Sequence, residues 1–183
     1  MTTTDRGAVR LPAAVEELLD KQAITEVLAR YARGIDRVDP ELIASCYHPE
    51  AVDSHGPWEG TGHDFARRPA RSAPENKANH HAQCQTLIEL DGDTALVETY
   101  FSYHRIYTTT EGADRLQEGF GRYVDRFAKR AGVWRILARK VVMDVTREGP
   151  VTEEVVTAHH FEQGQRYPDD LVYHPERLPR EQR

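Results

Sequence analysis

A long amphipathic pattern near the start of the chain constrains the fold more than any other feature. Between Glu16 and Arg37, apolar side chains recur at spacings of three and four residues, the period of an α-helix with one apolar stripe. The stripe consists of Val15, Leu18, Ile24, Val27, Leu28, Tyr31 and Ile35. A helix of this length must bury its stripe, so the rest of the chain has to supply a layer that covers it.

Asp36 lies close to the end of this helix, on the row of Leu28 and Ala32 at the edge of the stripe. The backbone dipole disfavours negative charge at a helix C-terminus, so a carboxylate there needs a cationic or hydrogen-bonding partner. The alternative interpretation is an exposed Asp at the start of the turn that leads to Pro40.

The remaining elements divide into short helices followed by long strands. Asp39-Pro40 begins a second helix, expected to reach Tyr47, because Asp is a favoured N-cap and Pro fits the first helical position. Further expectations are a strand over 51–54, a helix over 60–68, a loop over 69–78, and strands over 80–90, 94–107, 117–127 and 133–145. Sequential strands joined by turns predict an antiparallel meander, and helices placed before them predict an α+β fold.

The 183 residues fit one domain over 13–149, with a lead-in over 1–12 and a polar tail over 150–183. Val155, Val156 and Phe161 are the tail's few apolar anchors, and we expect it to dock on the domain or on a neighbouring subunit. We interpret Cys46 and Cys84 as buried free thiols, because they have no metal-ligand spacing.

Charge and composition narrow the classes of partner. The net charge is −6, and acidic and basic residues are interspersed along the chain without a basic stripe, which argues against nucleic acid as the main partner. With 39% hydrophobic and 30% charged residues, the chain has no apolar run long enough to span a membrane. The lead-in carries no apolar signal region, so the expected location is the cytoplasm.

Arg139 is unusual because it lies between apolar residues on one face of the last strand. A buried guanidinium without a partner would cost several kcal/mol, so this side chain should meet a carboxylate or line a wet cavity. Asp36 is a natural partner, and Glu98 and Asp125 are alternatives. In a further interpretation the last strand is an edge strand, and the long Arg139 side chain extends to solvent.

His80 and His81 stand at the head of the first long strand and must point to opposite faces. Strict alternation backward from Leu90 selects His80 as the inward one, whereas a bulge in the strand selects His81. An imidazole held by a carboxylate is a common means of moving a proton near neutral pH, although an inward His is also often a packing residue.

Several polar aromatic residues can either line a pocket or fill the core. They are Tyr31, Tyr47, Trp58, Tyr103 and Tyr123. Tyr31 is the strongest catalytic candidate among them, because it lies about one and a half turns before Asp36 on the same helix. Nucleophile elbows, phosphate-binding glycine loops and dinucleotide fingerprints are absent from the sequence.

Taken together, these motifs resemble the SnoaL-like family. The helix ending in Tyr-x-x-x-x-Asp, Asp39-Pro40, Asn79-His80-His81 and the closing strand with Arg139 carry the resemblance, which covers about residues 14 to 148. That family belongs to the superfamily of scytalone dehydratase, nuclear transport factor two and ketosteroid isomerase. The resemblance implies a cone-shaped α+β barrel, in which a curved sheet wraps around the N-terminal helices, and a homo-oligomer, either a dimer or a trimer.

The resemblance to two lyase branches, bile-acid 7α-dehydratase and lindane dehydrochlorinase, implies specific roles. They would place an Asp–His dyad on Asp36 and His81, with Arg139 and Tyr31 nearby, and this favours His81 over His80. The implied function is a lyase (dehydratase) or isomerase that needs no cofactor or metal and acts on a hydrophobic, oxygenated molecule of steroid or polyketide type. Alternatives are a polyketide cyclase or pericyclase, a non-catalytic binding protein, and the small subunit of an oxygenase.

Overall fold

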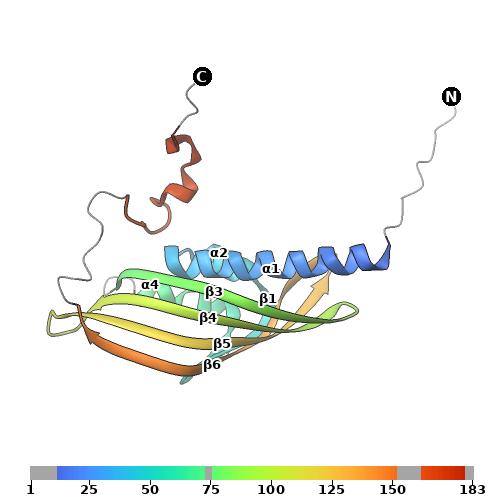
Figure 1. Ribbon diagram of the computed structural model, residues 1–183, viewed down its shortest axis with the longest axis horizontal. Coiled ribbons are helices and arrows are strands. Elements are labelled where there is room, and N and C mark those ends of the chain that lie inside the picture. Colours follow the sequence, from blue (N-terminus) through green and yellow to red (C-terminus); the bar gives the residue numbers. More distant parts are fainter. Residues whose placement is uncertain (1–11, 73–75, 152–161, 180–183) are drawn as a thin grey trace.

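The computed structural model describes residues 12–72, 76–151 and 162–179, in which one long helix lies along a curved six-stranded sheet (Figure 1). The helices are α1 (Ala13–Arg37), α2 (Pro40–Ser45), α3 (Gly62–Ala66) and α4 (Arg68–Ser72), followed near the C-terminus by the 3-10 turns η2 (Leu171–Tyr173) and η3 (Pro175–Arg177). The strands are β1 (Tyr47–His55), β2 (Trp58–Thr61), β3 (Asn76–Asp91), β4 (Thr94–Thr108), β5 (Asp114–Arg130) and β6 (Val133–Pro150). The expected α+β fold with a curved sheet is confirmed.

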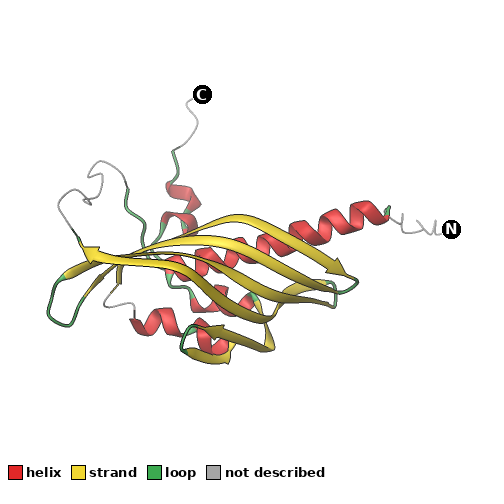
Figure 2. Ribbon diagram, turned by 60° about the horizontal axis from the view of Figure 1, so that its bottom comes forward, coloured by secondary structure: helices red, strands yellow, loops and turns green. Residues whose placement is uncertain are grey.

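The sheet has the order β2-β1-β6-β5-β4-β3 and is mixed and open (Figure 2). Strands β3 to β6 form the expected antiparallel meander. Strand β1 joins its far side by pairing parallel to β6, with Asp53 beside Arg139. On the other side of β6, Arg139 is paired with Asp125 of β5. Arg139 therefore has an acidic residue beside it on each neighbouring strand.

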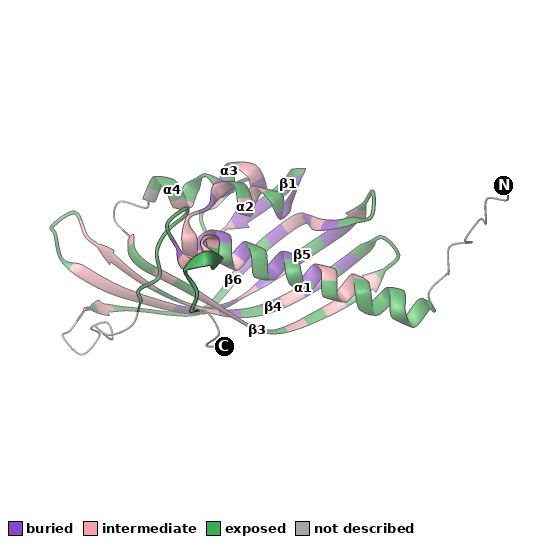
Figure 3. Ribbon diagram, turned by 90° about the horizontal axis from the view of Figure 1, so that it is seen from above, coloured by how far each residue is buried: buried purple, intermediate pink, exposed green. Residues whose placement is uncertain are grey.

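The apolar stripe of α1 packs on the sheet along the later turns of the helix only. Ile24, Val27 and Leu28 are almost completely buried, whereas Val15 and Leu18 are 38% and 66% exposed. Figure 3 shows the exposed turns at the N-terminal end of α1, beyond the buried part. The expectation that Val15 and Leu18 face the core was wrong, because the first turns of the helix extend past the layer that covers the rest.

The junction between α1 and α2 fixes the end of the long helix next to the cavity described below. Val38 adopts a left-handed conformation with φ of 57°, and its N–H donates to the carbonyls of Gly34 and Ile35. The side chain of Asp39 accepts from Leu42 N at 2.9 Å and so caps α2, as expected. A Cβ on Gly34 would lie 2.7 Å from a side-chain carbon of Ile43, so glycine permits the close packing of the two helices.

Three local expectations were wrong. Helix α2 ends at Ser45, because Tyr47 already pairs in β1. The expected loop over 69–78 contains α4 and the start of β3, and Pro69 fits α4 because it lies in the first turn. Cys46 is buried as expected, but Cys84 is exposed, next to an irregularity in the pairing of β3.

Residues 162–179 lie against the C-terminal end of α1. The N–H of Tyr167 donates to the carbonyl of Arg37 at 2.6 Å, and the Arg37 guanidinium pairs with Asp170 at 3.0 Å. The Tyr173 hydroxyl donates to Asp39 at 3.1 Å. The expected anchors Val155, Val156 and Phe161 lie outside the described residues. Within the described ranges, no helix has the length and apolar character needed to cross a membrane.

Candidate active site

Asp36 and His81 form the hydrogen-bonded pair that the resemblance implied. The Asp36 carboxylate accepts from His81 twice: Oδ1 lies 2.7 Å from the ring Nδ1, and Oδ2 lies 2.9 Å from the backbone N. Both side chains are largely buried, with exposed fractions of 9% for Asp36 and 14% for His81. Two donors thus stabilise a carboxylate in the last turn of α1, where the helix dipole alone would disfavour it.

A strand irregularity decides which histidine faces inward. The register of β3 against β4 shifts between Gln83 and Thr86, so the inward positions change from odd to even numbers along β3. His81 consequently faces Asp36, while His80 is exposed. Gln83, on the same face as His81, donates to the carbonyl of Leu28 on α1.

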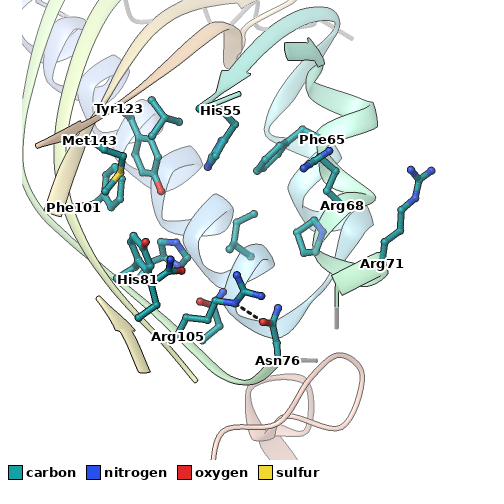
Figure 4. A pocket seen from close by; sticks show the side chains of 17 residues that line it. His55, Phe65, Arg68, Arg71, Asn76, His81, Phe101, Arg105, Tyr123 and Met143 are labelled. Atoms are coloured by element: carbon teal, nitrogen blue, oxygen red, sulfur yellow. Dashed lines mark hydrogen bonds between the residues drawn. The ribbon is translucent and has the colours of Figure 1, made fainter. Parts of the chain in front are cut away.

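His81 lines a cavity of about 620 Å³ bounded by the end of α1, the sheet and the α3–α4 segment (Figure 4). A volume of this size is typical of small-molecule sites. The apolar side chains in its wall are Ile35, Phe65, Pro69, Phe101, Val141 and Met143. The polar ones are His55, Arg68, Arg71, Asn76, Asn79, His81, Tyr103, Arg105, Gln117 and Tyr123. The Nε2 atom of His81 makes no hydrogen bond to any described residue, so it is available to a ligand.

Arg139 pairs with Asp125 and not with Asp36. Its Nε and Nη2 donate to the two carboxylate oxygens of Asp125 at 2.7 and 2.6 Å, and both side chains are fully buried. Burial lowers the pKa of Arg139, but the adjacent Asp125 carboxylate outweighs it and raises the pKa well above its usual value. The guanidinium contacts the rings of Tyr31 and Tyr123, 4.1 Å from each centroid, and these two rings are almost perpendicular to one another.

The five aromatic candidates separate into two that line the cavity and three that do not. Tyr103 and Tyr123 line it as expected, and burial raises the pKa of both hydroxyls, so they stay protonated and can donate. Tyr31 is buried behind Tyr123. The Tyr47 hydroxyl donates to Asp53 at 2.5 Å in the core. Trp58 packs outside the cavity on Phe65. Tyr47 and Trp58 are thus not part of the cavity wall, contrary to expectation.

His55 is a cavity residue that the sequence interpretation missed. Its ring stacks on Phe65 with centroids 4.4 Å apart, and its Nδ1 lies 3.3 Å from Oδ1 of the fully buried Asp53. The signal that could have found it is the Asp-x-His pattern at 53–55, which places both side chains on one face of a strand. The cavity therefore has two imidazoles in its wall, each with a carboxylate behind it. No cluster of three or more metal-ligating side chains occurs among the described residues.

Comparison with known proteins gives one family and many structural neighbours. The SnoaL-like domain family matches residues 16–140. No curated protein shows a significant sequence match to the chain.

Three of the similar solved structures illustrate the range. A putative scytalone dehydratase from Novosphingobium aromaticivorans has a TM-score of 0.66 and 21% identity, covering 76% of this chain and 93% of that one. A type 2 hexachlorocyclohexane dehydrochlorinase (LinA) has a TM-score of 0.65 and 16% identity, covering 77% and 95%. A protein of unknown function from Mycobacterium tuberculosis has a TM-score of 0.60 and 26% identity, covering 75% and 78%.

Proposed function

This chain belongs to the SnoaL-like domain family, and on that premise we propose that its cavity is the active site of a cofactor-independent lyase or isomerase. The reaction is most simply the dehydration of a hydrophobic, oxygenated small molecule. The observation that carries the proposal is the Asp36–His81 pair, in which Nδ1 is bonded to the carboxylate and Nε2 is left for a ligand. Two of the structural neighbours are named as a dehydratase and a dehydrochlorinase, and both names describe eliminations.

In the proposed mechanism, His81 is the general base. Donation from Nδ1–H to Asp36 leaves a lone pair on Nε2, which removes a proton from the carbon next to a substrate carbonyl. The Asp36 carboxylate then stabilises the imidazolium that forms. The Tyr103 and Tyr123 hydroxyls donate to the carbonyl oxygen while negative charge develops on it.

Elimination also needs an acid for the leaving group. As the carbon–carbon double bond forms, the carbon–oxygen bond breaks, and the departing hydroxide must take up a proton to leave as water. His55, which lies in the cavity wall with Asp53 behind it, is the group that donates this proton. Arg139 and Tyr31 act indirectly, by holding the Tyr123 ring in place.

The experiment is an NMR assay in D₂O with a panel of hydrophobic β-hydroxy carbonyl compounds, following loss of the α-proton signal and appearance of the alkene. His81→Ala should lower the rate on the order of a hundredfold or more, because it removes the base. Asp36→Asn should also lower it, whereas Arg126→Gln, at an exposed site outside the cavity wall, should leave it unchanged. A His81→Ala variant that retains the wild-type rate would reject the mechanism.

A further inference from the structure

One side of the cavity carries positive charge that no carboxylate in the described wall balances. Arg105 reaches it from β4, and Arg71 of α4 lies at its edge, with a guanidinium that points away from the other labelled side chains in Figure 4. Among the described residues of the cavity wall there is no Asp or Glu. This arrangement is unusual for a chain whose net charge is −6, because acids outnumber bases over the sequence as a whole.

Arg105 is the best-defined of the three arginines in the cavity wall. It is half-buried, its Nε donates to the side-chain oxygen of Asn76, and its guanidinium lies over the Tyr107 ring at 4.6 Å. Both partners are neutral, and no described carboxylate forms an ion pair with Arg105. The side chain is therefore oriented without being neutralised, which is the arrangement that a site for an anionic group needs.

The other two arginines differ in their surroundings. Arg71 is exposed and has no ion pair with a described residue. The Arg68 guanidinium lies 5.0 Å from the centroid of Trp58. Arg105 therefore carries the inference, and Arg71 is a second cation at the edge of the cavity.

Three acidic groups among the described residues interact with residues of the cavity wall, and each is bound to another partner. Asp36 is held by His81, and Asp53 accepts from Tyr47 and His55. The charge of Glu148 contributes to the raised pKa of Tyr103, but Glu148 forms an ion pair with Arg115 at 3.2 Å. None of these carboxylates forms an ion pair with Arg105 or Arg71.

The opposite side of the cavity is aromatic and apolar. Figure 4 shows Phe101, Tyr123 and Met143 gathered away from the arginines, with His81 between Phe101 and Arg105. We propose that the ligand is an amphipathic acid, with an apolar body against the aromatic side and a carboxylate or phosphate on Arg105, at the side of the cavity where Arg71 marks the edge. The assignment of this ligand as substrate rests on the function proposed above; its binding does not.

The test is competitive binding with three probes that share a naphthalene body: 1-naphthamide, 1-naphthoate and 1-naphthyl phosphate. Each displaces the fluorescent neutral ligand N-phenyl-1-naphthylamine. The two anions should displace it at about tenfold lower concentrations than the amide, because one charge-assisted hydrogen bond is worth roughly that factor. The more effective of the two anions identifies the carboxylate or the phosphate as the preferred group.

Arg105→Gln should strongly reduce the preference for anions, Arg71→Gln should reduce it less, and the double variant should abolish it. The matched control is Arg126→Gln, which makes the same charge change outside the cavity wall and should keep the preference. Arg105→Lys, which keeps the charge and the half-buried stem, should retain part of the preference and tests the inference even if Arg105→Gln folds poorly. Equal displacement by the amide and the anions, or an anion preference that survives the double variant, would overturn the proposal. His81→Ala should keep the preference, so a failure of the base mechanism is distinguishable from a failure of this inference.

Discussion

Replacing Asp125 with Asn would test how much the buried ion pair contributes to the fold. The substitution keeps the size of the side chain and removes the charge opposite Arg139, which is fully buried and bonded to Asp125 at 2.7 and 2.6 Å. Breaking a buried pair by removing one partner costs about 3–5 kcal/mol, and the other acidic neighbour, Asp53, is already bonded to Tyr47 and His55. Total stabilities of domains are about 5–15 kcal/mol, so the variant should lose a large part of its free energy of unfolding.

The matched control is Glu98→Gln, which breaks a pair of similar length in a more exposed place. Glu98 and Arg122 are 2.7 Å apart, and each side chain is about a third exposed. Exposed pairs are worth about 0–1 kcal/mol, so this variant should unfold close to the wild-type urea concentration.

Urea denaturation followed by circular dichroism measures both variants. The double variant Asp125→Leu/Arg139→Met should recover most of the stability lost in Asp125→Asn, because an apolar pair leaves no buried charge. Equal losses in the free energy of unfolding for Asp125→Asn and Glu98→Gln would refute the reasoning that burial, and not the distance between the charges, sets what an ion pair contributes to stability.

Two further predictions concern carboxylates away from the cavity. Asp20 accepts from the indole N–H of the nearly buried Trp134 at 2.8 Å, so Asp20→Ala should cost about 1–3 kcal/mol in a thermal or urea melt, and Asp20→Asn, which keeps an acceptor, should cost less. At Asp170, burial raises the pKa, but backbone hydrogen bonds and Arg37 outweigh it and lower the pKa below 3.8. The stabilisation is therefore present above about pH 4 and is lost as the pH falls through the folded-state pKa. The backbone amide of Gln165 donates to Asp170 at 2.8 Å, so its NMR signal reports the ionisation of this carboxylate. The signal should titrate below pH 3.8 in the wild type and should not titrate in Asp170→Asn.

The position of Asp36 was accessible from the sequence because helical periodicity is local, whereas its pairing with His81 was implied only by the resemblance to the two lyase branches. Counting along α1 placed Asp36 at the edge of the buried stripe, and the helix dipole explained why it needed a donor. The choice between His80 and His81 was not accessible from periodicity alone. The choice depends on a register shift between Gln83 and Thr86, and the alternation of apolar and polar residues along β3 does not indicate that shift.

The partner of Arg139 was harder to predict because it depends on strand register between distant segments. Alternation along β6 showed that Arg139 faces inward, and Asp125 was one of three acids that could meet it. The pairing of β5 with β6 places Asp125 directly beside Arg139, while Asp36 is used by His81. His55 was missed for a related reason, since its place in the cavity wall depends on the parallel pairing of β1 with β6, which brings in a strand from before the meander.

The Tyr123 side chain is part of both the cavity wall and the surroundings of the buried ion pair, and this limits which substitutions the protein can accept during evolution. One face of its ring stacks on Phe101 in the cavity wall at 4.1 Å, and the ring also lies 4.1 Å from the Arg139 guanidinium. A mutation that reshapes the pocket at Tyr123 would therefore also expose the ion pair beneath it to a void. Adaptation to new ligands should instead accumulate in the α3–α4 segment, where Arg71 can vary without disturbing the core.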